Sequence, residues 1–127
     1  MKLTTHQFGE IEFEEKIIIE FESGILGFDE LKKFIVITEE DGIFYWLTSV
    51  DEPELVFPLY PMKVISENYP EVAGYEVFGI VKLDKNPSDI TLNMKAPIYL
   101  NQDVKKGFQK IVDNDEFPID YKLFIEN

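Results

Sequence analysis

The sequence predicts a mainly β fold, an antiparallel sandwich or barrel with a few short helices. In several short runs, side chains alternate with a period of two residues, and β-branched and aromatic residues fill these runs. Both faces of the runs carry apolar residues, as where Phe34 and Val36 alternate with Ile35 and Ile37. Strands that are apolar on both faces are typical of a sandwich or barrel rather than of a single sheet open to water.

The elements follow from these runs and from the turn signals between them. Strands are expected at residues 17–22, 34–37, 43–47, 77–83 and 108–112. Turn-forming residues cluster at residues 40–42, 84–89 and 106–107. Short helices are expected at residues 29–33, with Asp29 as the N-cap, at residues 102–106, and between Pro61 and Pro70. No repeat, low-complexity tract or linker interrupts this order.

Length and composition favour one domain, residues 1–127. A chain of 127 residues with 45% hydrophobic residues can bury a core without disulfides or metals. It has no apolar run long enough to span a membrane, and its N-terminus lacks the apolar core of a signal peptide. The absence of cysteine fits a reducing compartment. We therefore expect a cytoplasmic protein that does not enter the membrane and is monomeric when alone.

The charge is strongly negative and unevenly distributed. The net charge is −13, and every basic residue is a lysine. Residues 1–60 hold 14 acidic residues against 4 lysines, whereas residues 61–127 hold 11 against 8. Such a chain repels a phosphate backbone, so direct binding of nucleic acid is not expected. Two interpretations stay open: the charge serves solubility, or an acidic face attracts a basic partner.

The sequence offers no catalytic or metal-binding pattern. His6 is the only histidine, and no serine is flanked by the glycines of a nucleophile elbow. The loop that begins at Asp84 resembles a calcium loop, but Asp89 stands where glycine is needed and Lys95 where the closing glutamate belongs. We predict no catalytic residues, no metal site, no cofactor and no enzymatic activity.

Two segments have clear local requirements. Gly24 and Gly27 bracket a loop that calls for positive φ or close packing, with Phe28 folding back into the core. Pro97 removes a ladder donor, so its strand must break, bulge or lie at an edge. Asparagine amides can satisfy the backbone groups that this leaves unpaired, so at least one of Asn93 and Asn101 is expected to be structural. Whether either also contacts a partner stays open.

An ordered set of motifs runs through the chain. It comprises Gly24-Ile25-Leu26-Gly27-Phe28, then Trp46-Leu47-Thr48-Ser49 with its acidic continuation Asp51-Glu52-Pro53-Glu54 toward Phe57, then residues 91–101 around Ala96-Pro97, and finally Gly107-Phe108-Gln109. This set resembles the flagellar assembly factor FliW family. The resemblance implies a small β-rich pseudo-barrel with short helices at its ends. Its structural motif residues here are Gly24, Gly27, Phe28, Trp46, Pro97, Gly107 and Gln109.

The resemblance also implies two protein partners. One is flagellin, held before export, and the other is CsrA, an RNA-binding translational repressor that the protein would antagonise without competing for the RNA site. By motif position, the expected partner-binding residues are Ser49, Asp51, Glu52, Glu54, Asn93, Lys95 and Asn101. Exposed aromatic anchors are expected among Tyr69, Tyr75 and Tyr99, which flank prolines or turns.

Two other functions remain as alternatives. An acidic decoy that mimics nucleic acid for another basic protein would carry its acids in a regular double stripe. A carbohydrate-binding β domain would present Trp46 and tyrosines as an exposed coplanar row of rings.

Overall fold

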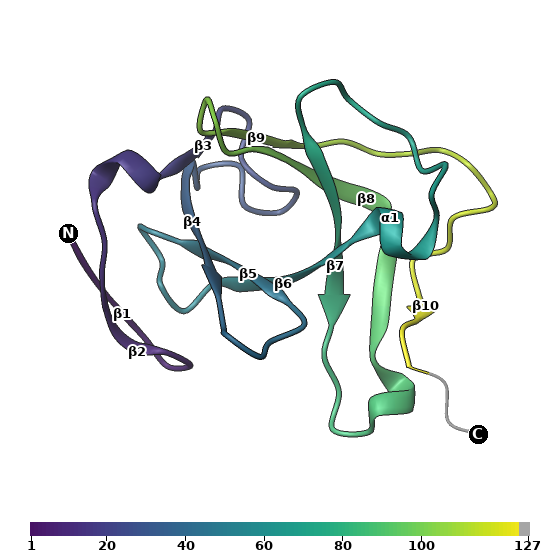
Figure 1. Cartoon of the computed structure of the whole chain (residues 1–127), viewed down its shortest axis with the longest axis horizontal. Helices are drawn as coiled ribbons and strands as arrows, with labels where there is room; N and C mark the ends of the chain where they lie inside the picture. The colour runs from purple at the N-terminus through teal and green to yellow at the C-terminus, as the bar shows by residue number, and fades with distance from the viewer. Residues whose placement is uncertain (125–127) are drawn as a thin grey trace.

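The computed structural model describes residues 1–124, so residues 125–127 of the expected domain lie outside the described part. Strands β3 (Ile19–Phe21), β4 (Lys33–Thr38), β5 (Tyr45–Ser49), β6 (Val56–Pro61), β7 (Glu76–Lys82), β8 (Thr91–Asn101) and β9 (Lys106–Gln109) form a closed barrel (Figure 1). Neighbouring strands are antiparallel, except that β3 and β9 close the barrel as a parallel pair. The mainly β barrel is therefore confirmed, with one parallel seam that the sequence did not indicate.

Smaller elements surround the barrel. An N-terminal hairpin of β1 (Lys2–Thr5) and β2 (Gly9–Glu12) forms a separate two-stranded sheet and is followed by the 3₁₀ turn η1 (Glu15–Ile17). Helix α1 (Met62–Ile65) links β6 to β7, and the 3₁₀ turn η2 (Pro87–Asp89) lies between β7 and β8. Strand β10 (Tyr121–Lys122) pairs with the first half of β8, whereas β9 pairs with its second half.

Three apolar clusters explain why the strands are hydrophobic on both faces. The barrel interior contains fully buried side chains such as Phe21, Phe34 and Phe78. A second cluster, around Tyr69 and Tyr99, lies outside β7 and β8, beneath the α1 segment and the C-terminal segment. A third cluster lies between the N-terminal hairpin and the outer face of β4. The wall of the barrel is thus covered from inside and, over much of its surface, from outside.

The expected strands were largely confirmed. Residues 34–37, 43–47 and 77–83 correspond to β4, β5 and β7, and residues 17–22 contain β3 and begin at the last residue of η1. The strand expected at residues 108–112 is β9, which begins at Lys106 and ends at Gln109. It ends earlier than expected because the chain beyond Gln109 bonds irregularly to β8, through Val112 N to Lys95 O. Strand β6 was not predicted because Pro58 and Pro61 interrupt its sequence.

The helix predictions had mixed outcomes. The short helix between Pro61 and Pro70 is confirmed as α1. The helix expected at residues 29–33 is wrong: Asp29 lies in a turn, and Lys33 already begins β4. The helix expected at residues 102–106 is also wrong, because this segment is the tight β8–β9 connection, which Lys105 closes at a φ of 57°. The four residues between the paired strands β8 and β9 cannot offset the unfavourable nucleation of a helix.

Candidate functional site

The Gln109 side chain joins three segments of the motif set that are distant in sequence. Its Nε2 donates to the Ala96 carbonyl at 2.9 Å, and its Oε1 accepts from the Leu26 amide at 2.8 Å. The loop at Leu26 needs its glycines, since Gly24 and Gly27 have φ of 68° and 86°. Phe28 packs against the barrel core, as expected. The motif residues thus build a structural junction at the barrel seam.

Strand β8 bulges at Ala96-Pro97, as Pro97 predicted. Phe78 pairs with Ile98 and Ile80 pairs with Asn93, so residues 94–97 of β8 stand opposite Gly79 alone. The Asn93 Oδ1 accepts hydrogen bonds from the backbone amides at positions 95 and 96, at 2.9 and 3.2 Å. Asn93 therefore satisfies backbone donors that the bulge removes from the ladder.

Asn101 has a similar structural role at the end of β8. Its Oδ1 accepts from the amides of Asp103 and Val104 at 3.0 and 3.2 Å, which closes the β8–β9 turn. The prediction that at least one asparagine is structural is confirmed for both. Lys95 reaches sideways, and its Nζ donates to the Asn114 carbonyl at 3.0 Å. A partner role for Asn93, Lys95 and Asn101 stays a prediction.

The acidic loop after β5 has a buried base and exposed carboxylates. Ser49 is fully buried, and its Oγ accepts a hydrogen bond from the Glu52 amide at 3.0 Å. The hydroxyl therefore stabilises the backbone conformation of the loop. Asp51, Glu52 and Glu54 are exposed. In the part of the chain that the structure describes, none of these three carboxylates forms an ion pair.

The predicted partner-binding residues do not form one site. The acidic loop follows β5, whereas Asn93, Lys95 and Asn101 belong to β8, and β6 and β7 separate these strands in the barrel wall. Any partner that contacts both groups would have to cover a large part of the wall. Two partners could instead use different faces.

The expectation of exposed tyrosines is wrong for two of the three candidates. Tyr69 is 1% exposed and Tyr99 is fully buried. The Tyr69 hydroxyl donates to the Met94 carbonyl, and the Tyr99 hydroxyl donates to the Pro70 carbonyl at 2.9 Å. Burial raises the pKa of both hydroxyls, and the neighbouring Tyr99 adds to the rise in the pKa of Tyr69. These tyrosines anchor the loop between α1 and β7 onto β8.

Sequence reasoning did not find the row of rings around Trp46. Trp46 is 8% exposed, as befits a structural motif residue, and lies edge-on to both Phe8 and Phe44, with ring centroids 5.8 Å apart in each case. Phe44 in turn lies edge-on to Tyr60 at 6.3 Å. We call Phe8, Phe44, Trp46 and Tyr60 the Trp46 strip. Its rings are steeply inclined rather than coplanar, which does not favour stacking on a sugar.

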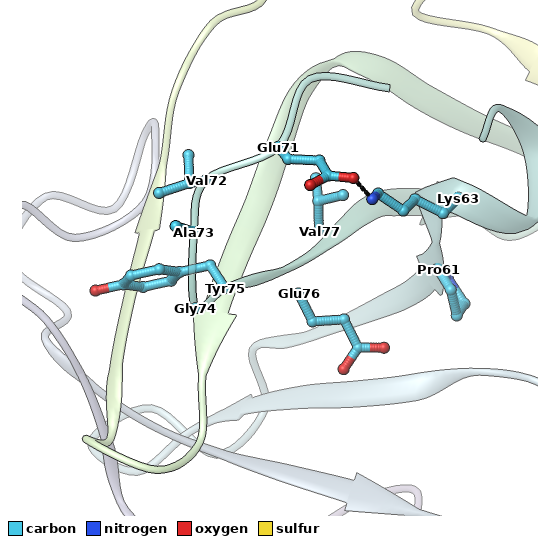
Figure 2. A pocket seen from close by; sticks show the side chains of 9 residues that line it. All are labelled: Pro61, Lys63, Glu71, Val72, Ala73, Gly74, Tyr75, Glu76 and Val77. Carbon is cyan, nitrogen blue, oxygen red and sulfur yellow. Dashed lines mark ion pairs between the residues drawn. The ribbon is translucent and has the colours of Figure 1, made fainter. Parts of the chain in front are cut away.

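A cavity of about 300 Å³ lies beside α1 and the start of β7. Figure 2 shows the Lys63 ammonium facing the Glu71 carboxylate, with which it forms an ion pair, and the Tyr75 ring directed away from that pair. Tyr75 is half-buried and packs on Phe108 instead. The residues that line the cavity include no serine, cysteine or histidine.

Two kinds of element are absent within residues 1–124, a cluster of metal-ligating side chains and a membrane-spanning helix. In that range no three His, Cys, Asp or Glu side chains converge as a metal site. No helix in the same range has the length and apolarity needed to cross a membrane.

A family model, two known proteins and a solved structure that resemble this chain carry the same description. The family model of the FliW protein matches residues 2–73 and 70–123. A flagellar assembly factor FliW from Caldicellulosiruptor saccharolyticus is 36% identical and is aligned over 92% of this chain and 86% of its own length. One from Clostridium tetani is 36% identical over 99% and 97%. A crystal structure of the flagellar assembly factor FliW matches with a TM-score of 0.86 and 30% identity, covering 98% of both chains.

Proposed function

This chain belongs to the FliW family, and we propose that it is a cytoplasmic flagellar assembly factor that acts by binding two proteins and catalyses no reaction. The first partner is flagellin, which it holds before export. The second is CsrA, which it captures once flagellin has left. Capture relieves the repression that CsrA exerts on the translation of flagellin.

The observation that carries this proposal is the excess of acidic residues in the N-terminal half, 14 against 4 lysines in residues 1–60. The net charge of the chain is −13. Asp51, Glu52 and Glu54 are exposed and take part in no ion pair among the described residues. A protein that binds RNA must be basic where it contacts phosphates. Complementary fields raise the rate at which such a protein and an acidic partner meet, and they add specificity.

The same charge supports an antagonism that does not cover the RNA site. An acidic body bound beside that site repels the RNA phosphates, so the two ligands are negatively coupled. A tenfold loss of RNA affinity requires a coupling free energy of only about 1.4 kcal/mol. Interactions between charges separated by less than the Debye length, about 10 Å at 0.1 M salt, can supply it.

Flagellin would bind through an amphipathic terminal segment that is disordered before assembly and folds onto an apolar surface. We assign the acidic residues Asp51, Glu52 and Glu54, shaped by Ser49, to the CsrA side. The β8 residues Asn93, Lys95 and Asn101 stay candidates for contact with either partner. The two groups lie on different strands, which would allow separate partner faces.

Calorimetric titration of purified CsrA and of flagellin into this chain tests the proposal. The wild-type protein should bind both. The triple substitution Asp51→Asn, Glu52→Gln, Glu54→Gln should lower the affinity for CsrA by about tenfold, given about 0.5 kcal/mol for each exposed charge. The matched control neutralises three exposed acids elsewhere, Asp113→Asn, Asp115→Asn and Glu116→Gln. Failure of the wild type to bind either protein would overturn the proposal.

A further inference from the structure

The outer face of β5 and β6 is only partly covered. Trp46 pairs with Ile37 on β4 and with Pro58 on β6, and residues directly opposite in a ladder share a face. Ile37 packs with the N-terminal hairpin outside the barrel, so Trp46 and Pro58 also face outward. Tyr60 pairs with Gly79 and packs with the cluster outside β7 and β8. The Trp46 strip therefore lies on the outside of the barrel wall.

This strip is not a completed core. Phe8, Phe44, Pro58 and Tyr60 are all partly exposed. The Trp46 Nε1 is buried and has no hydrogen-bond partner among residues 1–124. A buried indole N–H normally finds an acceptor, because leaving it unpaired is costly. A strip of half-covered rings around an unpaired donor is typical of a surface that a partner completes.

Acidic residues flank the strip at both ends of β5. Before β5 the chain carries Glu39, Glu40 and Asp41, and after it the chain carries Asp51, Glu52 and Glu54; we call these the two acidic turns. All six side chains are exposed, and none joins an ion pair within residues 1–124. Ile43, beside the first acidic turn, is 53% exposed. The five residues of β5 span about 17 Å, at about 3.3 Å for each residue, and the two acidic turns lie beyond its two ends.

We propose that the Trp46 strip and the two acidic turns form one docking surface for a protein segment with an apolar centre and basic ends. The segment is a helix, of which about 11 residues match the length of β5, since each helical residue spans about 1.5 Å. Its apolar side covers the rings, and its lysines or arginines meet the two turns. The unneutralised carboxylates repel a phosphate backbone, which makes nucleic acid the wrong occupant. This inference rests on the proposed protein-binding function and assigns a surface to it.

Trp46 is the only tryptophan of the chain and therefore reports directly on the surface. The probe is a synthetic, tryptophan-free peptide with a leucine-rich centre and lysine pairs about 11 residues apart. Its addition should change the fluorescence of Trp46 in a saturable manner. One control peptide carries glutamate in place of lysine, and another carries serine in place of leucine; both should leave the fluorescence unchanged. A response to the serine peptide equal to that of the probe would overturn the apolar part of the proposal.

Two variants that lose the same number of negative charges test where on the protein the probe peptide binds. Neutralising the first acidic turn by Glu39→Gln, Glu40→Gln and Asp41→Asn should weaken binding of the probe peptide by about tenfold, since three exposed ion pairs with its lysines are lost. The control variant at positions 113, 115 and 116 should change the affinity by less than about twofold. Equal weakening by both variants would show a diffuse charge effect and would refute the docking surface.

The outcome also separates this inference from the proposed function. If CsrA and flagellin bind the wild type and neither is weakened by neutralising the first acidic turn, the docking surface is wrong and the function stands. If neither protein binds the wild type, the function itself is wrong, whatever the probe does. A circular dichroism spectrum of each variant that matches the wild type excludes loss of folding as the cause.

Discussion

The loop of Gly24 and Gly27 offers a test of the structural junction at the barrel seam. Both glycines have positive φ, but their surroundings differ. A Cβ at Gly24 would lie 2.7 Å from the carbonyl oxygens of Phe28 and Asp29 and 2.8 Å from the Asp29 Cα. A Cβ at Gly27 would meet no atom within 4 Å. The substitutions Gly24→Ala and Gly27→Ala therefore share the backbone strain and differ only in the clash.

The expected magnitudes follow from this difference. Placing alanine in the left-handed region costs about 1–2 kcal/mol at either position. Overpacking adds about 1–3 kcal/mol at Gly24, where the obstructing atoms are backbone and cannot rotate away. The effect of alanine on the unfolded chain is common to both variants and cancels in the comparison. Gly24→Ala should thus be less stable than Gly27→Ala by about 1–3 kcal/mol.

Urea unfolding followed by the fluorescence of Trp46 measures both variants. The difference should also appear as a lower melting temperature of Gly24→Ala, by about 4 °C for each kcal/mol. Gly9→Ala is a further control, because Gly9 has a φ of 68° and open space around its Cβ position. If Gly24→Ala and Gly27→Ala were equally destabilised, the close approach of the loop to its own backbone would be refuted.

Other predictions concern single side chains. Gln109→Leu should lower the free energy of unfolding by about 2 kcal/mol because two backbone groups lose their partner, whereas Gln102→Leu, at an exposed site, should change it by less than about 0.5 kcal/mol. Asn93→Ala should destabilise by about 2 kcal/mol, since two bulge amides lose an acceptor, and chemical denaturation would show it. Burial raises the pKa of Tyr69 above its ordinary value of 10.0, so the unfolded chain releases this proton first and stability falls as the pH rises above that value. Above that pH, Tyr69→Phe should reduce the fall in the free energy of unfolding by up to about 1.4 kcal/mol per pH unit. If the free energy of unfolding fell with pH as steeply in the variant as in the wild type, the burial of the Tyr69 hydroxyl would be contradicted.

Local patterns were sufficient for much of the fold. The strands with apolar residues on both faces were predictable because the barrel wall is covered from inside and from outside. The bulge at Pro97 was predictable because proline cannot donate to a ladder, whatever surrounds it. The positive φ of Gly24 and Gly27 likewise depends on local sterics.

Tertiary packing decided what the sequence could not show. Tyr69 and Tyr99 flank turns and prolines, yet folding buries them against each other and against β8. Strand β6 forms despite Pro58 and Pro61 because β5 and β7 lie on either side of it. Neither outcome is encoded in the neighbouring residues.

The functional residues show the same limit. Motif order identified Gln109 as important, but its hydrogen bond to Leu26, 83 residues away, depends on closure of the barrel. Ser49 was predicted as a partner-binding residue, but its burial and its hydrogen bond to the Glu52 amide depend on packing that the sequence does not show. The Trp46 strip was missed because its rings come from the N-terminal hairpin, the segment just before β5, β5 itself and β6, whose relative positions only the fold defines.

The measurement that tests the central claim most directly is the affinity of CsrA for RNA with and without this protein, at about 50 mM and about 300 mM salt. If the negative charge of the bound protein repels the RNA phosphates, the protein should weaken the binding of RNA to CsrA by about tenfold or more at the lower salt concentration and distinctly less at the higher one. Saturating RNA should not remove the protein from CsrA. Antagonism that is equal at both salt concentrations, or tight binding of RNA by the protein itself, would contradict the account.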